Sequence, residues 1–164
     1  MKALYRLKNL KALEVFDKSG RKIGEVEDIA IDYYEKNVLG FIMPKKFLSK
    51  KNFFSIEDII IFGDTIVVDK ISVYEGLKFS DIKGFNIINT MGKTIGNIED
   101  LIVDKNFKIL AMIGSKGFFY KFIKGKDIFL LQNSVLGKRN ILYLGKDEVE
   151  LKSLPHSIWR EKDA

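Results

Sequence analysis

Four aspartates are the residues of this sequence best suited to chemistry, because carboxylates bind metal ions and act as general acids or bases. They are Asp28, Asp32, Asp100 and Asp104. Residues 28–32 are typical of a β-strand, with Ile29 and Ile31 on one face and Asp28 and Asp32 on the other. Residues four apart on a strand are separated by about 13 Å, too far for two carboxylates to share one ion or one scissile bond. We therefore expect these side chains to accept hydrogen bonds from turn main chain or to face water.

The remaining residues offer no catalytic arrangement. Gly92-Lys93-Thr94 is similar to the end of a phosphate-binding loop, but the earlier glycine of such a loop is Ile87 here, and the following pattern is that of a strand. His156 is the single histidine and the chain has no cysteine, which argues against a histidine triad, a multi-histidine metal site and a cysteine nucleophile. We predict a non-enzyme with no catalytic, metal or cofactor site and no small-molecule substrate.

Basic residues interleaved with aromatic ones are the best functional candidates. Residues 77–152 carry 13 basic against 8 acidic residues, whereas residues 1–76 carry 13 against 12. Such a surface can neutralise phosphates and stack bases, or dock on an acidic protein; alternatively, the aromatics are strand core and the lysines a solvated rim. The candidate partner-binding residues are Lys45, Lys46, Lys50, Lys51, Lys116, Phe118, Tyr120, Lys121, Phe122, Lys124, Lys126, Lys138 and Arg139.

An internal repeat sets the architecture that positions these residues. Gly20, Gly24, Asp28 and Asp32 recur 72 residues later as Gly92, Gly96, Asp100 and Asp104, in similar settings. We expect the glycines to supply positive φ or a β-bulge. The repeat predicts one domain over residues 1–76 and a second over 77–152, and residues 153–164 form a C-terminal tail with a short helix.

The local pattern is that of short strands and tight turns, so we predict an all-β protein with a small barrel or half-barrel per repeat. Expected strands in the first repeat are 13–17, 22–33, 37–43, 59–62 and 65–70. Those in the second are 85–89, 94–104, 108–114, 118–123, 127–132 and 135–144. Residues 55–59 match 124–128, and each stretch is expected to form a single turn that leads into the next strand.

The repeated pattern resembles the PRC-barrel family. It comprises an apolar strand, a turn ending in glycine, then Lys-Ile-Gly-Glu-Val-Glu-Asp-Ile and a strand that ends in an acid, and it is carried by residues 20–32. Residues 92–104 carry it a second time, with Thr-Ile-Gly-Asn-Ile-Glu-Asp-Leu in the equivalent place. The residues Glu57-Asp58-Ile59 match the later acidic turn of the family. The resemblance implies two tandem small β-barrels that assemble with other macromolecules and share no enzymatic activity.

The amino-acid composition predicts the cellular compartment of the protein. The absence of cysteine favours a reducing, cytoplasmic setting. The longest uncharged apolar runs, such as 59–62 and 128–131, are far shorter than the roughly 20 residues of a membrane helix, so we expect no membrane insertion. Together these features favour a cytoplasmic, non-catalytic adaptor that binds a protein partner. The alternative is an RNA- or ribosome-associated module that uses the basic and aromatic loops of the second repeat.

Overall fold

The computed structural model describes residues 4–116 and 126–145, and it divides the chain into two compact units. Unit 1 comprises Met1–Lys83 and Asp100–Leu110, and unit 2 comprises Gly84–Glu99 and Ala111–Ala164. The units therefore divide the chain at different places from the sequence repeats, because two segments of the second repeat, 77–83 and 100–110, belong to unit 1. The predicted strand 118–123 and the predicted helical tail lie outside the described residues.

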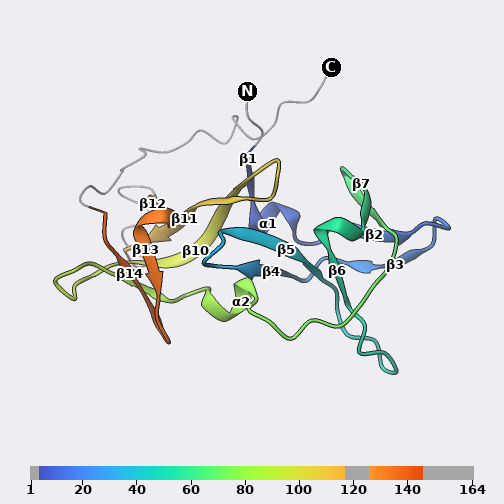
Figure 1. Cartoon of the computed structure of the whole chain (residues 1–164), viewed down its shortest axis with the longest axis horizontal. Helices are drawn as coiled ribbons and strands as arrows, with labels where there is room; N and C mark the ends of the chain where they lie inside the picture. The colour runs from blue at the N-terminus through green and yellow to red at the C-terminus, as the bar shows by residue number, and fades with distance from the viewer. Residues whose placement is uncertain (1–3, 117–125, 146–164) are drawn as a thin grey trace, which may run out of the picture. The chain divides into compact units, whose positions relative to one another are not determined.

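Unit 1 is built mostly from short strands (Figure 1). In chain order its elements are β1 (Leu4–Arg6), α1 (Leu7–Leu10), β2 (Glu14–Asp17), β3 (Lys22–Glu25), β4 (Asp28–Asp32), β5 (Asn37–Ile42), β6 (Phe53–Ser55), the 3-10 turn η1 (Ile56–Asp58), β7 (Ile59–Phe62), β8 (Thr65–Val68) and α2 (Phe79–Ile82). One sheet has the order β3-β2-β8-β7, and another has the order β4-β5-β6. In addition, β1 pairs antiparallel with residues 102–104 of β10 (Thr94–Asp104).

Unit 2 repeats the order of elements that runs from β2 to β8 in unit 1. It contains β9 (Asn86–Ile88), the first part of β10, most of β11 (Ile109–Ser115), β12 (Asp127–Leu130), the 3-10 turn η2 (Leu131–Asn133), β13 (Ser134–Leu136) and β14 (Asn140–Tyr143). In both units the last strand of this repeated series lies parallel to its first strand, since β8 pairs with β2 and β14 pairs with β9. The all-β prediction is confirmed.

Each unit closes its core around equivalent positions of the two repeats. Val15 in β2 corresponds to Ile87 in β9, and both side chains have no exposed surface. In the same way Phe54 in β6 corresponds to Phe129 in β12, again with no exposed surface on either. Burial of these apolar side chains stabilises each unit by the hydrophobic effect and fixes strand register.

The predicted barrels are not closed by the strand pairing of the described residues. The expected strand 22–33 is interrupted at Val26 and Glu27, so that β3 pairs with β2 whereas β4 pairs with β5. A strand that changes partner at a bend produces two short sheets rather than one continuous sheet. The expected strand 135–144 is likewise a hairpin, in which the Gly137 N–H donates to the Asn140 carbonyl.

Two more differences concern the ends of strands. The single turn expected at residues 55–59 is present as η1, but its counterpart is η2 at Leu131–Asn133, not 124–128. Burial decides the correspondence, because Phe129 must occupy the core position of Phe54. The sequence analysis also missed β1, β6 and the single-turn helices α1 and α2, which are too short for a helical or alternating pattern to be detected. Within the described residues no helix is both long and apolar enough to cross a bilayer.

Candidate interaction surfaces

The aspartates of the repeat serve the fold in two different ways. Asp32 and Asp104 cap equivalent turns: Asp32 Oδ1 accepts the N–H groups of Tyr34 and Glu35, and Asp104 Oδ1 accepts those of Asn106 and Lys108. An aspartate that accepts main-chain N–H groups two or more residues ahead stabilises a tight turn. These two carboxylates are therefore used in turn formation.

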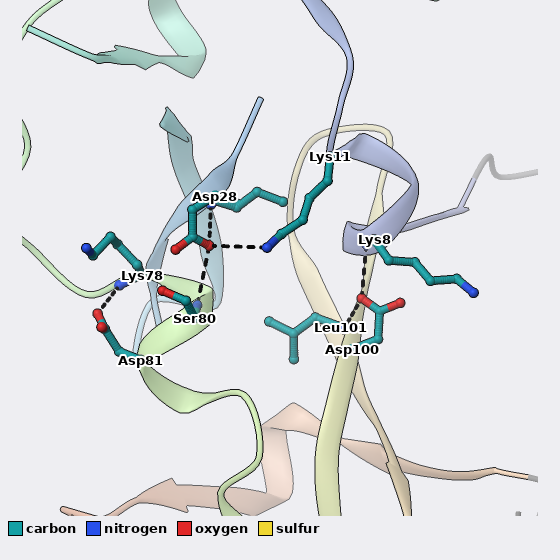
Figure 2. Close-up of polar contacts among 9 residues, drawn as sticks. Lys8, Lys11, Asp28, Lys78, Ser80, Asp81, Asp100 and Leu101 are labelled. Carbon is teal, nitrogen blue, oxygen red and sulfur yellow. Dashed lines mark hydrogen bonds and ion pairs between the residues drawn. The ribbon is translucent and has the colours of Figure 1, made fainter. Parts of the chain in front are cut away.

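Asp28 and Asp100 are buried instead, and each is held by main-chain N–H groups from two segments of unit 1 (Figure 2). Asp28 Oδ1 accepts the N–H of Ile29 at 2.9 Å and that of Ser80 in α2 at 3.3 Å. Asp100 Oδ1 accepts the N–H of Leu101 at 2.9 Å and that of Lys8 in α1 at 3.2 Å. Asp28 therefore accepts main-chain hydrogen bonds, one of the two expected roles, and does not face water, since it is only 7% exposed.

Each buried carboxylate also has a cation beside it. Arg6 Nε lies 2.9 Å from Asp100 Oδ2, and Lys11 Nζ lies 3.9 Å from Asp28 Oδ1. Buried charge is tolerated only when it is paired and hydrogen-bonded, and both conditions are met. Among the described residues no cluster of three or more His, Cys, Asp or Glu side chains could hold a metal ion. Each of the two buried aspartates therefore has a structural role, because it links a strand to a single-turn helix.

The repeated glycines occupy special backbone positions. Gly20 and Gly92 have φ angles of 83° and 75°, which L-amino acids with a side chain rarely adopt. Gly24 and Gly96 directly follow Ile23 and Ile95, the extra residues of two β-bulges in the β2–β3 and β9–β10 pairs. The glycines therefore shape turns and bulges.

The basic residues that sequence analysis singled out are distributed over several loops. Lys45, Lys46, Lys50 and Lys51 are exposed on the loop between β5 and β6, and Lys138 and Arg139 are exposed in the turn between β13 and β14. Lys116 and Lys126 are also exposed, and Lys126 Nζ forms an ion pair with Glu99 at 2.7 Å. The candidates Phe118, Tyr120, Lys121, Phe122 and Lys124 lie outside the described residues, so most of the basic and aromatic cluster of the second repeat stays a prediction.

The aromatic residues near these lysines divide into core and surface. Phe53 and Phe54 are buried, as is Tyr143, whose ring packs edge-on against Phe129 with centroids 5.2 Å apart. Phe47 is fully exposed, and its neighbour Leu48 is 92% exposed. The interpretation that the aromatic residues belong to the core therefore holds for those in the strands, but it does not hold for Phe47 in the loop between β5 and β6.

A second exposed apolar feature was missed by the sequence analysis. Ile60 and Ile61 of the edge strand β7 are 54% and 57% exposed. Consecutive residues of a regular strand point to opposite faces, but a register shift between Ile59 and Ile61 makes Ile60 an unpaired bulge residue. The apolar run 59–62 predicts a strand, and only the pairing order shows that this strand lies at the edge of a sheet.

Comparison with known families identifies the architecture. The sequence profile of the PRC-barrel domain matches residues 3–73 and, a second time, residues 75–146. The chain belongs to the PRC-barrel family. The two matches confirm the resemblance inferred from the Gly and Asp repeat and make this a tandem PRC-barrel protein. A search among curated proteins finds no significant match to the chain.

The family boundaries give the buried aspartates a further meaning. Helix α1 belongs to the first PRC-barrel match, yet it donates to Asp100 of the second, whereas α2 of the second match donates to Asp28 of the first. The turns of the two repeats also pair in unit 1, since the Val38 N–H donates to the Phe107 carbonyl and the Ile109 N–H to the Lys36 carbonyl. The two PRC-barrel repeats are therefore interlocked by reciprocal contacts.

Proposed function

We propose that this tandem PRC-barrel protein is a cytoplasmic, non-catalytic adaptor that binds a protein partner through the edge strand β7. The observation that carries the proposal is the adjacent exposure of Ile60 and Ile61, at 54% and 57%. Strand β7 ends the sheet β3-β2-β8-β7, so its outer edge has no neighbouring strand among the described residues. An apolar pair on such an edge is a typical docking element, because a partner that covers it removes apolar surface from water.

The charge of the molecule favours an acidic partner. The chain carries a net charge of +6, and exposed lysines and arginine lie on the loops described above. Like-signed charge on exposed loops accelerates encounter with an oppositely charged surface, and this effect weakens as salt screens it. Contact at β7 would then supply affinity, and the basic loops would supply rate and orientation.

The experiment is an affinity capture from the native cell with three forms of the protein. They are the wild type, the variant Ile60→Asp/Ile61→Asp, and the control Val73→Asp, which changes a residue that is 50% exposed outside β7. The proposal expects a protein that the wild type and the control retain, that the double variant loses, and that binds the purified wild type directly. Circular dichroism checks that all three forms are folded. Equal capture by the double variant, or no specific capture by the wild type, would refute it.

RNA or ribosome association remains the alternative, and it rests mainly on residues 117–125. It expects salt-dependent RNA binding that is lost when Lys121, Lys124 and Lys126 are changed to Glu. The Ile60→Asp/Ile61→Asp variant would leave that binding unchanged. The two functions are therefore separated by which set of substitutions abolishes partner capture.

A further inference from the structure

The loop between β5 and β6, residues 44–51, is called the arm below. Its tip is a tight turn in which the Ser49 N–H donates to the Lys46 carbonyl at 3.2 Å. Phe47 and Leu48 are the two central residues of this turn. The central residues of a four-residue turn point away from the chain segments that the turn joins, and Gly, Pro, Asn, Asp and Ser are the usual occupants. Phe47 and Leu48 therefore do not stabilise the turn through the side chains that they place there.

The tip is the most exposed apolar feature among the described residues. Phe47 is 100% exposed and Leu48 is 92% exposed, so neither side chain packs against the rest of unit 1. Figure 1 shows the arm as the teal loop that leaves β5, extends beyond the strands and returns to β6. Large apolar side chains held in water without a packing role are a sign of a binding function.

The base of the arm is held in place. The Met43 N–H donates to the Asn52 carbonyl at 2.7 Å, and the Asn52 side-chain amide donates back to the Met43 carbonyl at 2.8 Å. Asn52 is only 7% exposed, and its own N–H donates to the Ser72 carbonyl. The arm is therefore presented from an ordered base, which lowers the entropic cost of using its tip in binding.

Four lysines surround the tip without acidic neighbours in sequence. Lys45 and Lys46 precede Phe47, Lys50 and Lys51 follow Leu48, and no Asp or Glu occurs between Glu35 and Glu57. Within the described residues none of the four takes part in an ion pair. The arm therefore combines two fully solvated apolar side chains with four lysines that have no ionic partner in that part of the chain.

We propose that the arm binds the surface of a membrane that contains anionic lipid. Phe47 and Leu48 enter the interface between headgroups and acyl chains, and the four lysines contact the headgroups from either side of the tip. An exposed apolar tip that is flanked in sequence by basic residues matches a membrane surface, which is negatively charged at the headgroups and apolar beneath them. The inference goes beyond the proposed function, because it concerns a different surface from β7.

A membrane fits the arm better than RNA does. Single-stranded RNA is bound on grooves or sheets where aromatic faces stack the bases, and Leu48 offers no such face. Specific phosphate recognition favours the bidentate fork of arginine, whereas all four basic residues here are lysines, which act as hydrated point charges. The lack of a long apolar run argues only against a segment that spans the membrane. An apolar tip of two residues that enters the membrane interface needs no such run.

The test is vesicle co-sedimentation with purified full-length protein. Vesicles of phosphatidylcholine are compared with vesicles in which about a third of the lipid is phosphatidylserine. The wild type should bind the anionic vesicles and should be released by salt. Phe47→Ser/Leu48→Ser should lower the partition coefficient at least about tenfold, and Lys45→Glu/Lys46→Glu at least about 25-fold.

Matched controls keep the test specific to the arm. Met91→Ser removes an apolar side chain that is 84% exposed in another turn, and Lys83→Glu/Lys93→Glu reverses two exposed lysines elsewhere. The Met91 control should bind as the wild type does, and the lysine control should lose less than the arm variant. Direct insertion is followed with Phe47→Trp in a Trp159→Phe background, whose tryptophan emission should shift to the blue on anionic vesicles.

Several outcomes would overturn the proposal. They are a wild type that binds neither kind of vesicle, arm variants that bind anionic vesicles as well as the wild type does, and a tryptophan at position 47 that stays in water. If arm variants instead lose affinity for a fluorescent single-stranded RNA while vesicles remain unbound, the arm is a nucleic-acid contact and the membrane assignment is wrong.

Discussion

Asp100 and Lys8 lie 92 residues apart in the chain, yet Asp100 Oδ1 accepts the Lys8 main-chain N–H at 3.2 Å. The same contact joins Asp28 to Ser80 in the opposite direction along the sequence, at 3.3 Å. Each PRC-barrel repeat thus supplies a single-turn helix that closes over a buried carboxylate of the other. This reciprocity explains why the two repeats contribute to one compact unit.

We expect the two carboxylates to contribute unequally to stability. Asp100→Ala should lower the free energy of unfolding by about 3 kcal/mol, because it leaves Arg6 without its buried partner and two N–H groups without an acceptor. Asp28→Ala should cost about half as much, since Lys11 lies farther away, at 3.9 Å. Urea unfolding followed by circular dichroism measures both. The exposed Asp64→Ala is the control and should change stability by less than about 0.5 kcal/mol. Equal effects of all three substitutions would show that the contacts of Asp28 and Asp100 with the single-turn helices do not stabilise the fold.

A left-handed backbone position offers a stabilising substitution. Ala12 has a φ angle of 65°, and its counterpart in the second repeat is Gly84, with a φ angle of 88°. Ala12→Gly should raise the midpoint of thermal unfolding and add about 0.5–1 kcal/mol, because glycine adopts this conformation without strain.

The reverse change at the equivalent position is the matched control. Gly84→Ala should destabilise by about 1–2 kcal/mol, although a Cβ there would meet no atom within 4 Å. Steric crowding is therefore excluded as a cause. Effects of the same sign at both positions would show that φ does not govern them.

Close packing at Gly40 in β5 should make this position intolerant of any side chain. A Cβ there would lie 2.2 Å from the Phe54 carbonyl oxygen and 2.6 Å from the Phe53 ring. Gly40→Ala should therefore destabilise by about 3 kcal/mol or more in urea unfolding. Gly63→Ala is the control, because a Cβ at Gly63 would meet nothing within 4 Å, and a loss there as large as at Gly40 would be inconsistent with the packing.

Acid should weaken unit 1 through two aspartates. Hydrogen bonds from the Ser19 hydroxyl and the Arg21 N–H lower the pKa of Asp17 to about 2. Burial raises the pKa of Asp58, but hydrogen bonds from Ser55 and the charge of Lys70 outweigh it, so this pKa is lowered overall from 3.8.

Because both carboxyl groups have a lower pKa in the folded state, their stabilisation is complete above the ordinary value of 3.8 and is lost as pH falls toward about 2. Carboxyl NMR titration should give a pKa for Asp17 near 2 in the wild type and closer to 3.8 in Ser19→Ala. An unchanged pKa in that variant would show that the Ser19 hydroxyl is not the main cause.

The sequence by itself determined the features that are encoded locally. The recurrence of Gly20 as Gly92 predicted two equivalent turns, and both residues have positive φ. The all-β class followed from short alternating runs between turn residues, and the tandem family assignment followed from the doubled motif. These properties depend on backbone preferences and on side-chain periodicity, which a few neighbouring residues specify.

Only the tertiary structure decided which segments meet. The sequence left open whether Asp28 faces water or accepts main-chain hydrogen bonds, and α2, which comes some fifty residues later, donates to it where it is buried. Phe47 and Phe54 look alike in sequence, yet one is fully exposed at a turn and the other has no exposed surface. Burial depends on the summed contacts of residues distant in the chain, and no local pattern contains those contacts. The repeat could therefore be predicted from sequence, whereas the interlocking of its copies and the exposed tip of the arm could not.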